Sequence, residues 1–283
     1  MHNPHAEWRT EYARHLVKSI ETVRGIQAVV VAGSVARNFA DAYSDVEIPI
    51  FWESLPDDET RHAIVNSLDA EFIVSYNGPA REDQLLIKGL QVDLWHITVR
   101  REEETIHSVL DEHQVDLSSL NAMDTIRCCI PLFGDEIIAK WKDRAKEYPE
   151  ELREAIVKAH LDSFAIGQLG LAAKRNDPTG FYAELTRLQQ EVFLILLALN
   201  KCYFPTFKWL YQTMKAMAIK PISIEQRFKR AYTLSFMDAI EDTKKVLEET
   251  LQLVWEQQLL ADKESAYQYL SYVRTATEKP ISA

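Results

Sequence analysis

Two acidic residues in this sequence have the spacing of a metal site. Asp45 and Glu47 are two residues apart in a segment that has the composition of a β-strand. Side chains at positions i and i+2 of a strand point to the same face, so these two carboxylates are expected to lie together. They would repel each other unless a cation lay between them, and such hard oxygen ligands favour Mg²⁺ or Mn²⁺. The spacing therefore predicts a divalent metal site.

A third acidic residue, Asp93, lies in a predicted strand over 90–98 whose other residues are mostly apolar. A lone charge is costly in such surroundings, and a neighbouring metal would explain its presence. We expect Asp93 to be either a third metal ligand or a general base, and the sequence does not choose between these roles. His96, on the same strand, falls on the opposite face and is expected to be structural.

A predicted phosphate-binding turn precedes the acidic pair. The apolar run 27–32 ends in Gly33 and Ser34, where a short helix is expected to begin. Gly33 lets the backbone approach a phosphate closely, Ser34 adds a hydroxyl, and the N–H groups of a helix start favour an anion. Arg37, one turn on, can bring a fork of donors to the same phosphates. These three residues are the predicted nucleotide-binding residues.

The elements that must hold these residues follow from apolar periodicity. Strands are expected over 27–32, 45–52, 71–76, 84–88 and 90–98, and helices over 6–24, 56–69, 101–112, 118–129 and 135–146. Gly89 marks either a hairpin or a kink between two strands. Pro49 cannot donate a ladder hydrogen bond, so the strand over 45–52 is expected to be at an edge, bulged or short.

After Tyr148-Pro149 the pattern becomes helical, with no convincing strand. Asp177-Pro178 is a typical helix start, and the following run over 192–197 is apolar nearly all round, as in a buried helix. The predicted fold class is α+β, with a mixed sheet flanked by helices over residues 1–147. An all-α helical bundle for substrate binding or interaction follows over 148–283.

Composition narrows the classes of partner. The net charge is −11, and residues 1–146 hold 15 Lys and Arg against 25 Asp and Glu, so a nucleic-acid partner is not expected. No apolar run is long enough to span a membrane, and the N-terminus lacks the layout of a signal peptide. The three cysteines form neither a disulfide framework nor a zinc site. We therefore expect a cytoplasmic protein.

The segment 33–47 resembles the nucleotidyltransferases of the DNA polymerase β superfamily, whose signature is Gly-Ser, a spacer, then Asp-x-Asp/Glu. Within that group it is most similar to kanamycin nucleotidyltransferase and related antibiotic-modifying enzymes. Their motif likewise reads Gly-Ser-x-x-Arg, closed by Tyr-Ser-Asp-x-Glu, which matches Gly33, Ser34, Arg37 and the run 43–47. The similarity continues weakly through 91–94 and 130–134. The segment after 148 matches only in being helical.

The resemblance implies an enzyme that transfers a nucleoside monophosphate, with AMP from ATP the expected case, to a hydroxyl of a small molecule such as an aminoglycoside. Asp45 and Glu47 would hold the metals, while Ser34 and Arg37 would bind the leaving phosphates. In kanamycin nucleotidyltransferase the base is a Glu on a helix of the second domain. Asp162 and Glu184 are the candidates here, and for both an ordinary helix-surface role is the alternative. The resemblance also implies a homodimer.

Two other functions fit the same residues. The chain could be a non-catalytic nucleotide-binding or partner-binding module of the same fold, or it could transfer the nucleotide to a protein side chain. All three acidic positions are filled, which favours an enzyme, although a set of metal-binding residues does not by itself establish turnover.

Overall fold

The computed structural model describes residues 2–78, 81–260, 262–272 and 274–276. The chain divides into two compact units, Met1–Tyr148 and Pro149–Ala283. Strands occur in the first unit, and the described part of the second unit is helical.

The first unit is built on a mixed six-stranded sheet with the strand order β3-β4-β5-β2-β1-β6. Strands β2 and β5 are parallel, and the other neighbouring pairs are antiparallel. The strands are β1 (Ile26–Val31), β2 (Val46–Trp52), β3 (Glu71–Asn77), β4 (Arg81–Ile87), β5 (Leu90–Thr98) and β6 (Ile130–Phe133). The predicted mixed sheet is thus confirmed.

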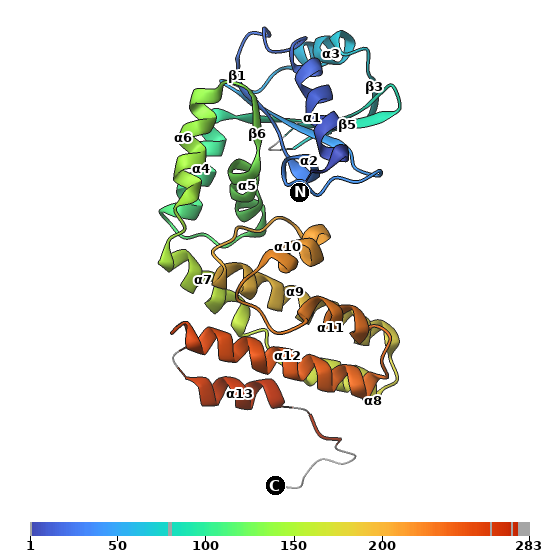
Figure 1. Ribbon diagram of the computed structural model, residues 1–283, viewed down its shortest axis with the longest axis vertical. Helices are drawn as coiled ribbons and strands as arrows, with labels where there is room; N and C mark the ends of the chain where they lie inside the picture. Colours follow the sequence, from blue (N-terminus) through green and yellow to red (C-terminus); the bar gives the residue numbers. More distant parts are fainter. Residues whose placement is uncertain (1, 79–80, 261, 273, 277–283) are drawn as a thin grey trace. The chain divides into compact units, whose positions relative to one another are not determined.

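Helices cover both faces of this sheet (Figure 1). The helices of this unit are α1 (Pro4–Val17), α2 (Gly33–Ala36), α3 (Asp58–Ser67), α4 (Val99–Leu110), α5 (Leu117–Cys128) and α6 (Asp135–Lys146). Ile48 and Leu94 belong to the main apolar core, which they share with residues of α1 and α3. On the opposite face Phe51 of β2 meets Trp141 of α6 edge-on, with ring centroids 4.9 Å apart. Because side chains alternate along a strand, the two faces are separate environments.

Local sequence explains several element boundaries. The side chain of Asn3 accepts a hydrogen bond from the N–H of His5 at the start of α1, and Asp57 and Asp116 cap α3 and α5 in the same way. Helix α1 ends at Val17, and the prediction of a helix to residue 24 was wrong. Between β4 and β5, Lys88 and Gly89 both have positive φ (50° and 84°), as in a tight hairpin turn.

The sheet differs from prediction at β2 and β6. Strand β2 is seven residues long and lies inside the sheet, between β5 and β1, so an edge or a short strand at Pro49 was wrong. The pairing of β2 with β1 does carry a register shift, between Ile26 and Ala28. The register between β2 and β1 runs from Trp52 to Ile50, so Pro49 lies just beyond it. On the other side, Pro49 is the register partner of Trp95 in β5. The edge strand β6 was not predicted.

The second unit packs around one long apolar helix. Helix α9 begins after Asp177, whose side chain accepts a hydrogen bond from the N–H of Gly180, as predicted, and it is buried through most of its second half. The elements of this unit are α7 (Glu150–Leu161), α8 (Gly167–Lys174), α9 (Pro178–Leu199), η1 (Phe207–Trp209), α10 (Leu210–Ala216), α11 (Ile224–Ala231), α12 (Phe236–Glu256) and α13 (Lys263–Ser271).

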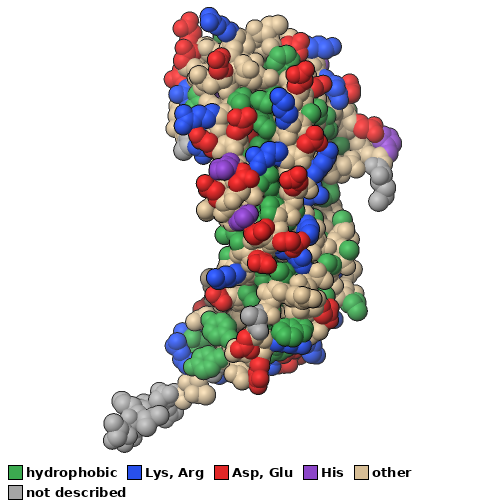
Figure 2. All heavy atoms as spheres, turned by 90° about the vertical axis from the view of Figure 1, so that its left-hand side faces the viewer, with side chains coloured by type: hydrophobic (Ala, Val, Ile, Leu, Met, Phe, Trp, Pro, Cys, Tyr) green, Lys and Arg blue, Asp and Glu red, His purple; other side chains and the backbone are tan. Residues whose placement is uncertain are grey.

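Charge is mixed on the surface. Figure 2 shows Asp and Glu side chains scattered among Lys and Arg across the visible face, without a large field of one sign. Among the helices of the described residues, none combines the length and apolar character needed to cross a bilayer.

Candidate functional site

Glu47 and Asp93 are register partners on the parallel strands β2 and β5. Both strands therefore present a carboxylate at the same level on the same face of the sheet. This is the face that carries Phe51 and lies opposite the apolar core of Ile48 and Leu94. The pairing joins two of the three predicted acidic site residues, although 46 positions separate them in the sequence.

The turn after β1 lies directly against the Glu47 carboxylate. Gly33 has a φ of +60°, and a Cβ built on it would overlap Oε2 of Glu47. The turn is tied to β2 by a hydrogen bond of 2.9 Å from the N–H of Ala32 to the carbonyl of Glu47. Glycine is thus required at position 33 both by the backbone conformation and by the approach of the acidic side chain.

Ser34 places an unsatisfied hydroxyl at this turn. The residue is 4% exposed, and its Oγ is buried without a hydrogen-bond partner. Buried polar groups are nearly always hydrogen-bonded, so an orphan hydroxyl indicates a ligand or ion that completes it. Gly33 therefore lies against Glu47, and Ser34 is the next residue along the chain.

Asp45 lies in the loop immediately before β2, which starts at Val46. This loop is anchored by Arg9 of α1, which is 3% exposed and donates from Nε to the carbonyl of Ser44 at 2.9 Å. Burial lowers the pKa of Arg9, and the charges of Asp41 and Asp45 act in the opposite direction. Arg9 thus supplies positive charge close to the acidic residues.

Helix α1 also fixes the first half of this loop. The Asn3 side chain donates from Nδ2 to the carbonyls of Asn38 and Ala40, each at 3.0 Å. Sequence reasoning missed both Asn3 and Arg9, because their partners lie some 35 positions further along the chain. The helix therefore positions the loop that leads from the Gly33 turn to Asp45.

Asp93 is 6% exposed and is held in place by its own strand. Nε2 of Gln91 donates to its two carboxylate oxygens at 3.0 and 3.3 Å. On the other side, Gln84 of β4 is its register partner. These hydrogen bonds orient the carboxylate on the face that it shares with Glu47.

The oxygen ligands at this site suit a hard divalent cation, and Asp45 lies apart from the other two acidic residues. Among the described residues, no group of three or more His, Cys, Asp or Glu side chains is arranged to hold a metal ion. The predicted triad of Asp45, Glu47 and Asp93 is therefore not gathered into one cluster, since Asp45 precedes the strand that aligns the other two. The pair Glu47 and Asp93, with the orphan oxygen of Ser34 nearby, is the oxygen-rich set that fits Mg²⁺ or Mn²⁺.

Arg37 is engaged within the protein. Its Nε donates to Oδ2 of Asp124 on α5 at 2.5 Å, and the two side chains are 7% and 12% exposed. Burial raises the pKa of Asp124, while the charge of Arg37 acts to lower it. The guanidinium expected at the phosphates therefore links the Gly33 turn to α5, with its Nε committed to that link.

The two candidate bases of the second unit have ordinary helix environments. Glu184 accepts hydrogen bonds from Nε and Nη2 of Arg187, one turn along α9, at 2.8 and 2.6 Å. Asp162 is the C-terminal capping residue of α7.

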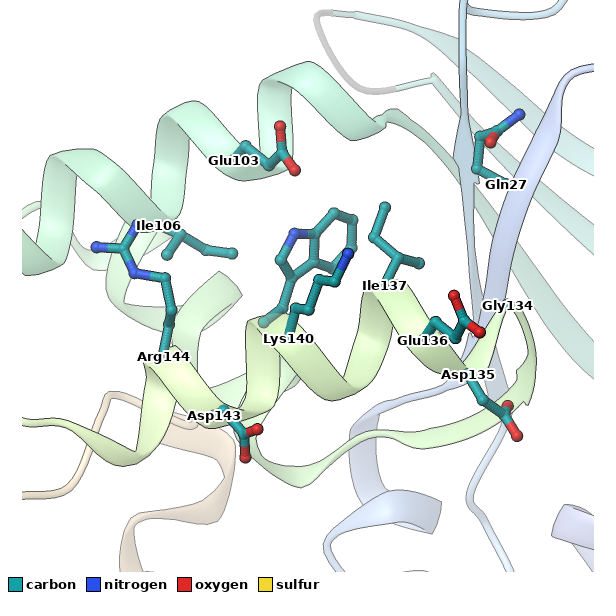
Figure 3. A pocket seen from close by; sticks show the side chains of 11 residues that line it. Gln27, Glu103, Ile106, Gly134, Asp135, Glu136, Ile137, Lys140, Asp143 and Arg144 are labelled. Atoms are coloured by element: carbon teal, nitrogen blue, oxygen red, sulfur yellow. The ribbon is translucent and has the colours of Figure 1, made fainter.

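A broad hollow of the first unit lies away from the acidic pair. It measures about 1140 Å³ and is bordered by α4, α6 and the start of β1 (Figure 3). Glu103 and Lys140 extend into it from the two helices, and Gly134 and Gln27 lie at its end. No residue of the predicted site lines it. A second cavity, of about 270 Å³, includes Pro49 and Trp95 and so adjoins the acidic pair.

Comparison with known proteins gives limited matches. Residues 131–210 match the family model described as "Domain of unknown function (DUF4037)". No curated protein matches the chain. Among solved structures, a nucleotidyltransferase-like protein from Exiguobacterium sibiricum 255-15 is similar at 9% identity and a TM-score of 0.44, covering 90% of this chain and 78% of that one. The family match begins after the acidic residues, so the chemistry of the site rests on the residues themselves.

Proposed function

We propose that this protein is a metal-dependent nucleotidyltransferase that moves a nucleoside monophosphate, in the expected case AMP from ATP, to a hydroxyl of a small molecule. The observation that supports it is the in-register pair Glu47 and Asp93 beside the Gly33 turn. Two carboxylates at one level of the sheet, next to a turn that carries a buried unpartnered hydroxyl, are suited to a metal and a phosphate chain.

In the proposed reaction Glu47 and Asp93 would hold Mg²⁺ or Mn²⁺, and Asp45 would add negative charge from the loop before β2. The metal, when bound, neutralises charge on the phosphates as it builds up. The acceptor oxygen attacks the α-phosphorus, and the bond from this phosphorus to the bridging oxygen breaks. Pyrophosphate leaves, and the hydroxyl proton passes to a base. Ser34 donates its hydroxyl to a phosphate oxygen, which satisfies the buried Oγ.

We assign Asp93 as a ligand and not as the base. Its register pairing with Glu47 places two carboxylates at one level of the sheet, as a shared cation would require, and Gln91 donates a hydrogen bond to it. Glu184 is a poor candidate while Arg187 holds its carboxylate.

The acceptor class rests on charge. The first unit is strongly acidic, with 15 basic against 25 acidic residues over 1–146, which suits a polycationic acceptor such as an aminoglycoside.

The test is pyrophosphate release from ATP and Mg²⁺ across a panel of aminoglycosides, lincosamides and simple polyols, with Asp45→Asn as the comparison. Release that depends on one acceptor and is lost in the variant is expected. ATP binding without release from any acceptor would contradict a transfer reaction to small molecules.

A further inference from the structure

A cavity of about 270 Å³ adjoins the acidic pair on the same face of the sheet. Pro49 and Trp95 form the register pair two residues beyond Glu47 and Asp93, and both line it. Two residues of a parallel strand span about 7 Å, so the cavity begins about that distance from the carboxylates. Helices α4 and α5 form the opposite wall.

The lining of this cavity holds one unpartnered buried donor and one desolvated carboxyl. Nε1 of Trp95 is buried and has no hydrogen-bond partner. Glu102 of α4 is 5% exposed, and no hydrogen bond from the described residues reaches its carboxyl. Burial raises the pKa of Glu102 to about 7, so near neutral pH much of it is protonated and able to donate. A buried donor left without a partner is destabilising, so the Trp95 N–H, with the Glu102 carboxyl in the same lining, points to a ligand that completes it.

The remaining walls define the chemistry of that ligand. Phe51 and Ile97 supply apolar surface, and Asn121 and Thr125 of α5 supply polar groups at the opposite side. A flat uncharged ring with both donor and acceptor atoms matches apolar walls with a few convergent polar groups. A polycationic aminosugar would need several carboxylates, whereas here one desolvated carboxyl shares the lining with Arg101.

We propose that this cavity binds the nucleobase of the donor nucleotide. The inference rests on the proposed nucleotidyl transfer, because the acidic pair would hold the phosphates while the ribose spans the two register steps to Trp95. Glu102 and the Trp95 indole N–H would then form hydrogen bonds with the edge of the base. The cavity thus selects among nucleoside triphosphates, and the carboxylates act on the phosphates that all of them share.

The experiment tests the proposed base site and the acidic pair separately. One probe carries only base and sugar, and the other carries only phosphates. Adenosine, guanosine, cytidine and uridine are titrated by calorimetry without metal, and inorganic tripolyphosphate is titrated with Mg²⁺. The variants are Trp95→Phe, which keeps the ring and removes the N–H, and Glu102→Gln, which keeps the shape and removes the acid. The controls are Trp8→Phe on the exposed side of α1 and Glu103→Gln, the exposed neighbour of Glu102. Thermal unfolding confirms that each variant is folded.

We expect at least one nucleoside to bind, with affinity reduced about tenfold in each cavity variant and unchanged in the controls. Tripolyphosphate binding should be the same in Trp95→Phe as in the unaltered protein. Nucleoside binding that both variants leave intact would overturn the inference. So would binding of Mg²⁺ and tripolyphosphate with no nucleoside binding, and in that case the proposed transfer would stand. Nucleoside binding that depends on the cavity, without any tripolyphosphate binding, would support the base site and contradict the transfer.

Discussion

The carboxylates of Glu47 and Asp93 are aligned by the parallel pairing of β2 with β5. It is the one parallel pairing among the strands that the structure describes. The ladder continues without a shift for seven residue pairs, from Val46 with Val92 to Trp52 with Thr98. Interior strands with so regular a register hold their side chains rigidly, which is what a metal site needs. The alignment is therefore a property of the sheet and not of a loop.

The first prediction concerns the contact between Gly33 and Glu47. Gly33→Ala is expected to destabilise the fold and to displace the Glu47 side chain, since the new Cβ overlaps Oε2. Gly89→Ala is the matched control, because Gly89 also has a positive φ but has open space around it. The backbone conformation costs about 1–2 kcal/mol in both. Urea unfolding should give similar losses in the two variants, because the end of the Glu47 side chain can move aside, whereas Mg²⁺ binding should weaken in Gly33→Ala alone. Unchanged Mg²⁺ binding in Gly33→Ala would contradict the contact.

The second prediction concerns the buried ion pair of Arg37 and Asp124. Removing one partner of a buried pair leaves an unpaired charge and costs about 3–5 kcal/mol, so Arg37→Ala should lower the free energy of unfolding on that scale. Arg100→Ala breaks the exposed pair with Glu104 and should change nothing measurable. In a double-mutant cycle with Asp124→Ala the losses should be strongly non-additive. Additive losses would show that the pair does not stabilise the fold.

The third prediction concerns acid stability and His96. Nε1 of Trp52 donates to Nδ1 of His96 at 3.1 Å, and because an indole can only donate, the ring carries its proton on Nε2, facing Asp83 at 3.1 Å. Burial lowers the pKa of His96 from its ordinary 6.5, despite the opposing effect of Asp83. Below pH 6.5 the unfolded chain therefore binds a proton that the folded chain does not. Stability attributable to His96 should fall with pH by up to about 1.4 kcal/mol per pH unit.

Asp83 and Glu102 also make stability depend on pH, but Asp83 does so in a lower pH range and Glu102 in the opposite direction to His96. Burial acts to raise the pKa of Asp83, but hydrogen bonds from His96, Arg61 and Ser75 outweigh it and hold the pKa well below its ordinary 3.8. Its contribution is therefore lost only below about pH 4. Glu102 opposes His96, because its pKa of about 7 makes the fold gain stability as pH falls from 7.

The measurement is thus the difference between the unaltered protein and His96→Gln, in urea unfolding at pH 7.5, 6.5 and 5.5. The unaltered protein should lose stability relative to the variant as the pH falls. Parallel curves for the two proteins would contradict the neutral, buried state of His96.

Sequence patterns predicted the elements that carry the site. The continuous apolar run over 27–32 and the alternation over 45–52 gave β1 and β2 nearly to their ends. Strand β6 was missed because its four residues include Pro131, which suits an edge but weakens any strand signal. Helix α1 was extended too far because Ile20 and Val23 keep the apolar spacing after the helix has ended. The spacing of apolar residues is the same whether a buried segment is a turn or a helix.

The contacts that assemble the site lie beyond sequence spacing. Alternation along the strand predicted over 45–52 placed Asp45 and Glu47 on one face, whereas β2 begins only at Val46. No local rule sets the register of β2 against β5. Arg9 gave no local signal, since its partner carbonyl lies 35 positions away. For Asp124 there was one signal, a charged residue between Met123 and Ile126, which are both buried in α5. A buried charge of this kind predicts a partner without naming it.

The central claim is that Glu47 and Asp93 together bind a metal with a nucleoside triphosphate. It is tested most directly by the thermal stability of the protein with ATP, with and without Mg²⁺, in Glu47→Gln, Asp93→Asn and the exposed-strand control Glu71→Gln. A ligand at about 100 times its dissociation constant stabilises a fold by about 2.7 kcal/mol. We predict this gain in the unaltered protein and in Glu71→Gln only when Mg²⁺ is present, and its loss in both site variants. The same gain without Mg²⁺, or its persistence in Glu47→Gln and Asp93→Asn, would contradict the account.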